Sequence, residues 1–249
     1  MSRLKNKVAI VTGASKGIGA GIAKAYGSEG ASVVVNYSSD KAGADQVVKE
    51  ILAGGGKAIA VQGNVSVAAD VKKLFAEAKK TYGKLDILVN NAGVFQFAPL
   101  EQVTEEEFHR QFNTNVLGTI LASQEAISHF NGDGGSIINL SSVVSDNPIA
   151  GSVVYSATKG AVDTIAVALS KELGARKIRV NTIAPGGVET EGTHTLGIIG
   201  GDFEKQMIAG TPLGRIGQPN DIAKVAVFLG SNDSEWINGE KISVSGGFR

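Results

Sequence analysis

Residues 7–19 of the chain read KVAIVTGASKGIG, an apolar run that passes into a glycine-rich turn and then into a helical pattern. Gly13, Gly17 and Gly19 are spaced so that the chain can turn, bring backbone close to a ligand and pack a helix on a strand. Backbone N–H groups at a helix N-terminus bind anions. The stretch therefore predicts a strand–turn–helix unit that receives a dinucleotide pyrophosphate, although its GxxxGxG spacing differs from the commoner GxGxxG.

Short apolar runs continue to alternate with longer helical patterns almost to the end of the chain. The predicted strands are residues 7–12, 32–37, 58–62, 85–90, 136–141, 179–184 and 241–244, and the predicted helices are about 17–29, 41–53, 67–82, 104–130, 153–175 and 219–230. Strands that are apolar on both faces are typical of a parallel sheet covered by helices. With right-handed crossovers, the pattern predicts one α/β domain over residues 1–249. We expect a Rossmann-type doubly wound parallel sheet of about seven strands with helices on both faces.

Residues 186–217 interrupt this pattern, because glycines and polar residues accumulate there and the helical period breaks. A loop of this length inside a compact domain usually has a function, so we predict a lid over the substrate. A disordered surface insertion is the alternative. The carboxylates Glu189 and Glu191 in this stretch could form a second acid pair, but we expect them to be solvated.

The composition excludes several classes of function. The 249 residues include 24 basic and 24 acidic side chains, and this zero net charge favours binding to neither nucleic acid nor an anionic membrane. Without cysteine there are no disulfides or thiolate metal sites, and the three histidines lack metal-ligand spacing, so no metal is expected. No apolar run approaches the roughly 20 residues of a membrane span, and no signal-peptide core is present. These features favour a cytoplasmic protein.

The end of the second predicted strand bears on the choice of dinucleotide. NAD-binding folds place an acidic residue about 20 positions after the glycines, where it holds the ribose 2′-hydroxyl. Here residues 35–39 read VNYSS, and no carboxylate occurs before Asp40. Ser38 and Ser39 offer hydroxyl donors to a 2′-phosphate, and Lys16 offers a cation. The sequence therefore predicts NADP(H), with NAD(H) as the alternative if Lys16 is only a solvated turn residue.

Tyr155 and Lys159 are four residues apart in a helical pattern and thus share one face. A phenol has a pKa near 10, and a neighbouring ammonium would lower that pKa into a range useful for proton transfer. Ser141 and Ser142 follow the fifth predicted strand, at the edge where open α/β sheets bind ligands. Ser142 can hydrogen-bond to a substrate oxygen, whereas Ser141 suits a turn. Together these residues predict a proton-transfer site.

The segments Thr12–Gly19, Asn90–Gly93, Tyr155–Lys159 and Pro185–Gly186, together with Asn115 and Ser142, resemble in order and spacing the short-chain dehydrogenase/reductase family. The resemblance covers the whole chain. It implies that Tyr155 is the general acid/base, that Lys159 lowers its pKa and holds the nicotinamide ribose, and that Ser142 positions the substrate oxygen. It also implies that Asn115, rather than Asn113, kinks the long helix and holds a water of the proton relay.

The resemblance extends the predicted cofactor site. With the residues named above, the full set is Gly13, Ser15, Lys16, Gly17, Ile18, Gly19, Tyr37, Ser38, Ser39, Asn64, Val65, Asn91, Ala92, Gly93, Tyr155, Lys159, Pro185, Gly186, Val188 and Thr190. Asn64, where the family usually has Asp, would accept from the adenine amino group. Residues 91–93 would line the riboses, and residues 185–188 with Thr190 would meet the nicotinamide carboxamide. Tyr37 stands at the family's acidic 2′-hydroxyl position, which agrees with NADP(H).

The substrate stays open at this stage. The leading hypothesis is an NADP(H)-dependent carbonyl reductase or alcohol dehydrogenase, and Phe95, Phe97, Val144 and Ile149 indicate an apolar pocket for a ketone. A 3-oxoacyl-[acyl-carrier-protein] reductase is an alternative. No cation ends the predicted helix 104–130 to receive an acidic carrier, which counts against it.

Several features leave the alternatives unresolved. Arg176 keeps the carrier-protein reading open, and residues 35–37, VNY, resemble glucose dehydrogenases of the family. A non-catalytic NADP-binding sensor or scaffold is least favoured, because both the tyrosine and the lysine are present.

His194 is expected at the surface or against substrate, and His109 and His129 are expected to be solvated or capping. The segment at Trp236 belongs either to the core or between the subunits of a homotetramer, which the resemblance implies.

Overall fold

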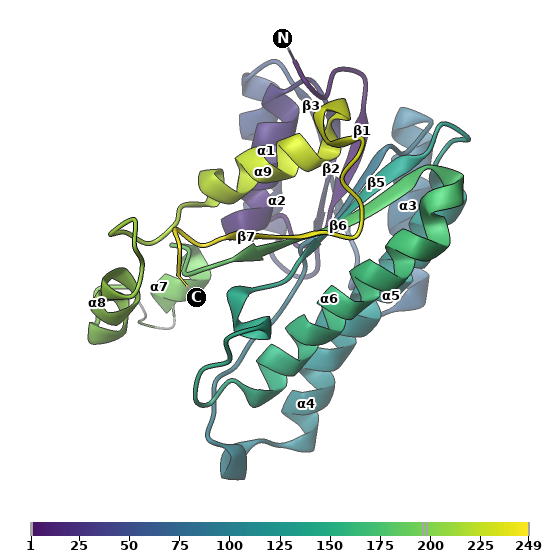
Figure 1. Cartoon of the computed structure of the whole chain (residues 1–249). Coiled ribbons are helices and arrows are strands. Elements are labelled where there is room, and N and C mark those ends of the chain that lie inside the picture. Colours follow the sequence, from purple (N-terminus) through teal and green to yellow (C-terminus); the bar gives the residue numbers. More distant parts are fainter. Residues whose placement is uncertain (1, 196, 198, 249) are drawn as a thin grey trace.

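The computed structural model describes residues 2–195, 197 and 199–248, and at its centre lies one sheet of seven parallel strands (Figure 1). The strands are β1 (Val8–Val11), β2 (Ser32–Tyr37), β3 (Lys57–Gln62), β4 (Ile87–Asn90), β5 (Gly135–Leu140), β6 (Ile178–Pro185) and β7 (Lys241–Val244). Their order in the sheet is β3-β2-β1-β4-β5-β6-β7. The order reverses between β1 and β4, and open α/β sheets bind ligands at the carboxyl ends of strands beside such a reversal. The predicted doubly wound sheet is confirmed.

Helices cover both faces of this sheet. One layer contains α1 (Gly17–Ser28), α2 (Lys41–Ala53) and α9 (Pro219–Gly230), and the other contains α3 (Ala68–Tyr82), α5 (Gly118–His129) and α6 (Val153–Leu173). Helix α4 (Glu105–Phe112) leads into α5, and the short helices α7 (Glu191–Thr195) and α8 (Asp202–Ala209) follow β6 (Figure 1).

Alternate residues of each central strand enter opposite layers of the core. In β1, Ala9 and Val11 belong to the cluster packed with α1, α2 and α9, whereas Ile10 belongs to the cluster packed with α3, α5 and α6. All three side chains are fully buried. Burying an aliphatic side chain such as that of Ile10 contributes about 1.5–3 kcal/mol. This burial on both faces explains why the strand runs are continuously apolar.

The long predicted helix 104–130 is not one regular helix. It consists of α4, a π-helical segment at Asn113–Leu117 and α5. A π-helical turn carries an extra residue, which the periodic spacing of apolar residues does not reveal, and such turns occur frequently at functional sites. The irregularity falls on Asn115, the residue that the resemblance assigned to a kink.

The irregular stretch 186–217 contains two helices that the sequence did not predict. Helices α7 and α8 are five and eight residues long, too short for a helical period to be visible among the glycines. An isolated bridge between Val188 and Gly217 joins the two ends of the stretch. Residues 196 and 198 of the predicted lid lie outside the described residues.

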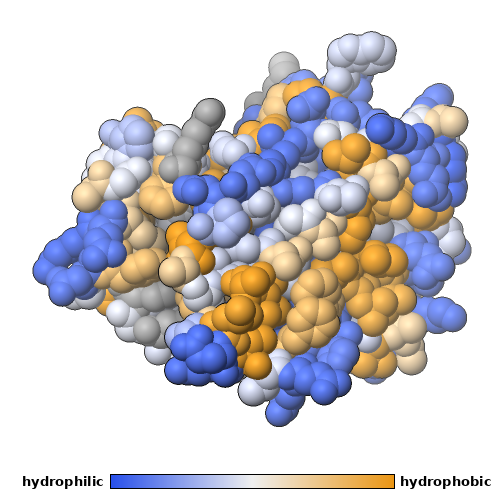
Figure 2. Space-filling model, turned by 60° about the horizontal axis from the view of Figure 1, so that its bottom comes forward, coloured by the Kyte–Doolittle hydropathy of each residue, from blue (hydrophilic) through white to orange (hydrophobic). Residues whose placement is uncertain are grey.

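An apolar area lies on the face that carries α5 and α6 (Figure 2). The exposed large apolar side chains from α4 through the π-helical segment to α6 are Phe108, Leu117, Ile120, Val153 and Val167. Trp236 is 97% exposed, which excludes the core alternative for its segment, and the alternative between subunits stays a prediction. None of the helices in the described ranges combines the length and the apolar content that a bilayer crossing requires.

Candidate active site

The turn between β1 and α1 leaves no room for side chains at its glycines. A Cβ atom on Gly13 would lie 2.8 Å from the Cα of Ala92, and one on Gly19 would lie 2.4 Å from Nδ2 of Asn91. Gly13 and Gly17 also have φ angles of +60° and +57°, which side chains disfavour. Among the described residues no side chain at the N-cap position closes the start of α1. The turn thus fits a pyrophosphate held by backbone N–H groups, as predicted.

One donor of this turn is already engaged by a carboxylate. The N–H of Gly17 donates to Oε2 of Glu191, the first residue of α7, at 2.8 Å. Thr190 lies beside it, since a Cβ on Gly17 would be 3.3 Å from Cγ2 of Thr190. The expectation that Glu191 is merely solvated is therefore wrong. Its carboxylate lies where the sequence places a phosphate, and a phosphate that bound this N–H would displace it.

The end of β2 presents hydroxyl groups rather than a carboxylate. Asp40 accepts a hydrogen bond from the N–H of Gly43 at 3.0 Å and thereby caps α2. Tyr37 is buried, whereas Ser38, Ser39 and Lys16 are exposed. The arrangement agrees with the absence of an acidic ribose ligand that the sequence predicts.

Asn36 has a structural role. Its side chain is 1% exposed. Its Oδ1 accepts from the N–H of Gly13 at 3.1 Å, and its Nδ2 donates to the carbonyl of Gly63 at 3.0 Å. These bonds join the glycine turn to the ends of β2 and β3. They account for the asparagine in the sequence VNY without a sugar substrate.

The side-chain oxygen that Asn64 is predicted to offer to the adenine is already engaged within the protein. Oδ1 of Asn64 already accepts from the N–H of Ser66 at 3.0 Å and from its hydroxyl at 2.8 Å. An adenine amino group would have to replace one of these bonds. Val65 is buried and packs against the start of α5, where a Cβ on Gly118 would lie 2.7 Å from Cγ2 of Val65.

Thr12 fastens the segment after β4 to the glycine turn. Its hydroxyl oxygen accepts from the N–H groups of Asn91 and Ala92, each at 3.0 Å. Nδ2 of Asn91 donates to the carbonyls of Thr12 and Gly13, each at 2.9 Å. The predicted ribose-lining residues and the predicted phosphate-binding turn therefore form one rigid unit.

The proton-transfer residues come together beside this unit. Nζ of Lys159 donates to the carbonyl of Leu140 at 2.8 Å and lies 5.5 Å from the centroid of the Tyr155 ring. A Cβ on Gly93 would lie 3.7 Å from the same Nζ. Ser142 follows β5, and its Oγ accepts weakly from the N–H of Val144 at 3.4 Å. Its hydroxyl also hydrogen-bonds to the phenol of Tyr155, and a substrate oxygen would have to draw it away from that partner.

Burial governs the proton affinity of Tyr155 and Lys159. Burial raises the pKa of Tyr155 to about 12, while hydrogen bonding with Ser142 acts in the opposite direction. Burial lowers the pKa of Lys159 to about 8, and the charge of Asp163 opposes this effect. The pKa of Tyr155 thus moves upward, opposite to the direction expected from Lys159, whose ammonium binds a backbone carbonyl and lies over the ring. The phenol is thus protonated at neutral pH, which is the form that can protonate a reduced carbonyl.

Asn115 uses its side chain to connect two parts of the site. Its Oδ1 accepts from the N–H of Val94 at 2.8 Å, and its Nδ2 donates to the carbonyl of Val94 at 2.8 Å and to Oγ1 of Thr158 at 3.0 Å. Its backbone carbonyl accepts from the hydroxyl of Thr119 at 2.8 Å. The predicted relay water could still bind a free lone pair of that carbonyl.

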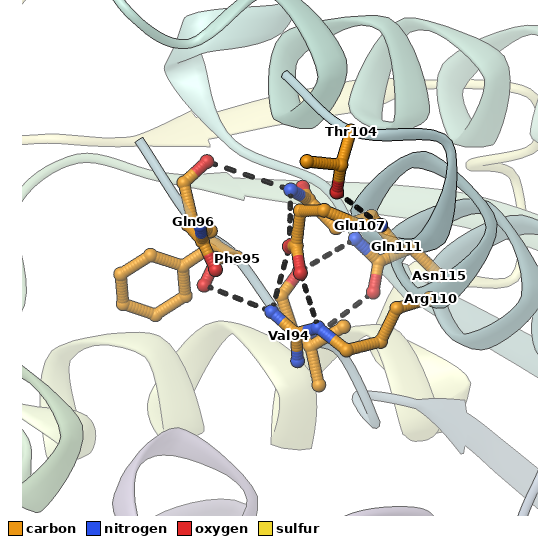
Figure 3. Close-up of polar contacts among 8 residues, drawn as sticks. All are labelled: Val94, Phe95, Gln96, Thr104, Glu107, Arg110, Gln111 and Asn115. Atoms are coloured by element: carbon orange, nitrogen blue, oxygen red, sulfur yellow. Dashed lines mark hydrogen bonds and ion pairs between the residues drawn. The ribbon is translucent and has the colours of Figure 1, made fainter. Parts of the chain in front are cut away.

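Helix α4 holds the segment that follows Val94 (Figure 3). Glu107 pairs with Arg110 and accepts from Nε2 of Gln111 at 2.8 Å. Arg110 and Gln111 in turn donate to the backbone carbonyls of Phe95 and Gln96 at 3.5 and 3.4 Å. Arg110 and Gln111 were not predicted as site residues, because no local pattern shows that a helix residue reaches a backbone carbonyl 15 positions earlier.

The segment that α4 holds carries Phe95 and Phe97. Together with Tyr155 of α6, these two residues form an aromatic cluster. The ring centroids of Phe95 and Phe97 lie 5.7 and 6.0 Å from that of Tyr155, and 5.6 Å from each other. Phe97 is 39% exposed, so part of the cluster faces outward. Two of the apolar residues expected to line the substrate pocket, Phe95 and Phe97, therefore lie against the ring of Tyr155.

The residues predicted to meet the nicotinamide lie on the chain that leaves β6. Pro185 ends that strand, and the N–H of Gly186 donates to the carbonyl of Val244 at 3.1 Å. Val188 is buried, and Thr190 exchanges hydrogen bonds with Thr193 at the start of α7. The segment thus runs from the sheet edge to the glycine turn.

The expectation that Glu189 is solvated needs correction. Glu189 accepts from Nε2 of Gln218 at 2.8 Å and pairs with Nε2 of His194 at 2.9 Å, so it is not simply solvated. Of the two alternatives for His129, the structure agrees with capping, because its Nδ1 lies 3.0 Å from the carbonyl oxygen of Glu125 in the last turn of α5 and its side chain is only 15% exposed, beside Phe75. His109, which is exposed beside Glu105, agrees with the expectation.

Arg176 lies far from the site. It belongs to the 3₁₀ turn Gly174–Arg176, directly before β6, and donates to the carbonyl of Ile127 at 2.9 Å. The site is at the carboxyl end of β6, so Arg176 is at the opposite edge of the sheet. It does not supply the entrance cation that a carrier protein would need.

Comparison with known proteins agrees with this geometry. Residues 13–249 match the family described as enoyl-(acyl carrier protein) reductase. An uncharacterised oxidoreductase of Methylorubrum extorquens is 58% identical over 249 residues, which cover all of both chains. A probable tetrahydroxynaphthalene reductase of Zymoseptoria tritici is 40% identical over 255 aligned residues, covering 98% of this chain and 95% of that one.

A solved structure extends the agreement to the fold. A short-chain dehydrogenase of Burkholderia cenocepacia, crystallised in complex with NADP, superposes with a TM-score of 0.92 at 33% identity, covering 98% of both chains. The chain belongs to the short-chain dehydrogenase/reductase family. Membership in the short-chain dehydrogenase/reductases confirms the resemblance drawn from the sequence. The roles of the individual site residues stay predictions.

Proposed function

We propose that the protein is an NADP(H)-dependent carbonyl reductase that acts on ketones attached to aromatic rings, with Tyr155 as the general acid. The observation that carries the proposal is the aromatic cluster, because it places two phenylalanine rings against a protonated phenol. The reverse reaction, oxidation of the alcohol, would use the same residues with the phenolate as base.

The chain's own groups fit NADP(H). The uncapped start of α1 would hold the pyrophosphate, and Lys16, Ser38 and Ser39 would meet the 2′-phosphate. The first carboxylate after β2, Asp40, is engaged as a helix cap by the N–H of Gly43, so its Oδ1 is not offered to a ribose hydroxyl. The Burkholderia cenocepacia relative crystallised with NADP supports this choice. When bound, the cofactor supplies a hydride for the carbonyl carbon.

Three side chains would handle the substrate oxygen. Ser142 donates a hydrogen bond to it and Tyr155 transfers its hydroxyl proton to it. The Lys159 ammonium, held by the carbonyl of Leu140, would contact the nicotinamide ribose and supply the proton that restores the phenol. Asn115 holds the segment after Val94 and, through its backbone carbonyl, a water that returns a proton toward Lys159.

Stacking provides the substrate preference. Aromatic pairs with centroids 4.5–7 Å apart contribute about 0.5–1.5 kcal/mol beyond the area that they bury. A flat ring next to the carbonyl can therefore join the aromatic cluster while its oxygen meets Ser142 and Tyr155. The name of the Zymoseptoria tritici relative, which refers to a hydroxynaphthalene, supports a ring substrate of this kind.

The test is NADPH oxidation with two ketones of the same skeleton, 1-tetralone and its saturated counterpart 1-decalone. We expect kcat/KM to be several-fold higher for 1-tetralone, and Phe95→Leu to reduce this preference.

Tyr155→Phe should lower kcat by about 10²–10⁴ while NADPH still binds. Acetoacetyl thioesters and glucose complete the panel. Faster turnover of either of them, or full activity of Tyr155→Phe, would overturn the proposal.

We also infer that a second copy of the chain covers the apolar area over α4 to α6 in a homotetramer. Five apolar side chains, each about half exposed, gather on these helices (Figure 2). Contiguous apolar areas on a folded surface mark interaction sites. A copy related by a two-fold axis would bury the same helices of both chains.

A further inference from the structure

Asp163 lies one helical turn beyond Lys159 on α6. Tyr155, Lys159 and Asp163 are spaced four residues apart and follow one another along one face of the helix. The Asp163 side chain is 18% exposed, and its Oδ1 is buried without a hydrogen-bond partner within the described part of the chain. Lys159 itself is 6% exposed. The proposed mechanism does not use this carboxylate.

Lys241 on β7 binds Asp163 and a second carboxylate. Its Nζ lies 3.0 Å from Oδ2 of Asp163, 2.5 Å from Oδ1 of Asp146 and 3.4 Å from Oγ of Ser145. Asp146 directly follows the 3₁₀ turn Val143–Ser145, which begins after Ser142. The ammonium of Lys241 therefore links the helix that carries Lys159 to the segment that carries Ser142.

A buried ammonium needs a nearby negative charge to stay protonated. Desolvation favours the neutral amine, and burial lowers the pKa of Lys159 to about 8. Asp163 is the group whose charge opposes this change. Lys241 offsets part of the charge on Asp163, since it pairs with the same carboxylate. The two residues thus act on Lys159 with opposite signs.

The other charged groups around α6 are placed so that they contribute little. Strand β5, the π-helical segment Asn113–Leu117 and the turn Val143–Ser145 carry no charged residue. Arg179 is the charged residue of β6 and lies at the opposite end of that strand from the site. On α4, Glu107 and Arg110 pair with each other. The titratable groups that remain near Lys159 are the phenol of Tyr155 and the cluster of Asp146, Asp163 and Lys241.

We propose that Asp163 is a positioning residue that keeps Lys159 in its ammonium form, and that Lys241 limits this effect while it holds the Ser142 segment in place. The role assigned to the Lys159 ammonium rests on the proposed function. The electrostatic coupling among the three residues does not depend on it.

The test measures the protonation of Lys159 directly. The full chain is labelled with trace acetic anhydride between pH 6 and 11, and acetylation of the Lys159 peptide is followed by mass spectrometry. The wild-type midpoint should lie near pH 8. Asp163→Asn should lower the midpoint by about one pH unit, and Lys241→Met should raise it, because each removes a charge of opposite sign. Lys241→Arg, which keeps the cation, should leave the midpoint unchanged.

The alkaline limb of kcat/KM for ketone reduction is measured on the same four proteins, with thermal melting to check folding. In each variant the alkaline limb should move in the same direction as the labelling midpoint. An unchanged midpoint in Asp163→Asn, or shifts of equal sign in Asp163→Asn and Lys241→Met, would overturn the coupling. Opposite midpoint shifts without movement of the kinetic limb would retain the coupling and refute the role of the Lys159 ammonium in catalysis.

Discussion

At Tyr155 and Lys159, burial acts on two ionisable groups in opposite directions. The neutral form is favoured in both, so the pKa of the phenol rises and that of the amine falls. In the proposed mechanism, carbonyl reduction requires the phenol and the ammonium together. Both are present below about pH 8, and above that value Lys159 loses its proton first, because its pKa is the lower of the two.

The pH dependence of the reaction follows from these two values. We expect kcat/KM for ketone reduction to fall above about pH 8, where Lys159 becomes neutral, with no contribution from Tyr155 below about pH 12. Steady-state kinetics across pH 6–10 checks this. A limb that begins only near pH 10 would contradict it.

Deprotonation of Lys159 does not destabilise the fold, so unfolding caused by this group would not produce such a limb. Its folded-state pKa of about 8 lies below its ordinary value of 10.5, so between these values the unfolded chain binds more protons at this site. Stability from this group therefore increases with pH across the window. Thermal melting at pH 7 and pH 9 provides the control for the kinetic experiment.

At the scale of elements, α7 is attached to the glycine turn through Glu191. This carboxylate binds the N–H of Gly17, while Glu189 connects the same segment to His194 and to Gln218 at the start of α9. The segment that the sequence predicts to be a lid is thus held at its beginning by two separate carboxylates. Its role as a lid stays a prediction.

Replacing Glu191 with Ala should strengthen NADPH binding. The change frees the N–H of Gly17 and removes a negative charge from the place expected to receive a phosphate. We expect Kd, measured by NADPH fluorescence, to fall about three- to tenfold, which corresponds to about 0.7–1.4 kcal/mol.

Glu189→Ala is the matched control, because it loosens the same segment without touching the turn. Its Kd should stay close to that of the wild type. An equal gain in both variants would show that anchoring of the segment matters and not the carboxylate at Gly17. Weaker binding in Glu191→Ala would contradict the prediction.

At the scale of the whole molecule, the apolar area over α4 to α6 predicts how copies of the chain associate. Ile120 and Val167 are each 43% exposed on neighbouring helices of this face. A glutamate at both positions would place buried charges against each other across a two-fold axis, at a cost of several kcal/mol.

The double variant Ile120→Glu/Val167→Glu should therefore reduce the assembly to a smaller species, measured by size-exclusion chromatography with light scattering. Leu52→Glu on α2, a 52% exposed apolar position in the other helical layer, should leave the mass unchanged. A wild-type chain that is monomeric, or a double variant with wild-type mass, would refute the proposed interface.

The sequence by itself determined the features that depend on local spacing. Continuous apolar strands, the glycine turn before α1 and the four-residue step from Tyr155 to Lys159 each involve neighbours in the chain, and all appear in the structure as predicted. Parallel strands also bring their carboxyl ends to one edge, so Ser142 and Tyr155 could be expected near each other from the order of elements alone.

Only the tertiary structure decided the contacts that join distant positions and the degree of burial. Glu191 meets Gly17 from 174 residues away, and Lys241 meets Asp163 from 78 residues away. The direction of the Tyr155 pKa shift likewise depends on how much water the surrounding chain excludes. Spacing along a helix or strand is set by backbone geometry that every sequence shares, whereas these charge contacts depend on how particular side chains pack, which no local pattern encodes.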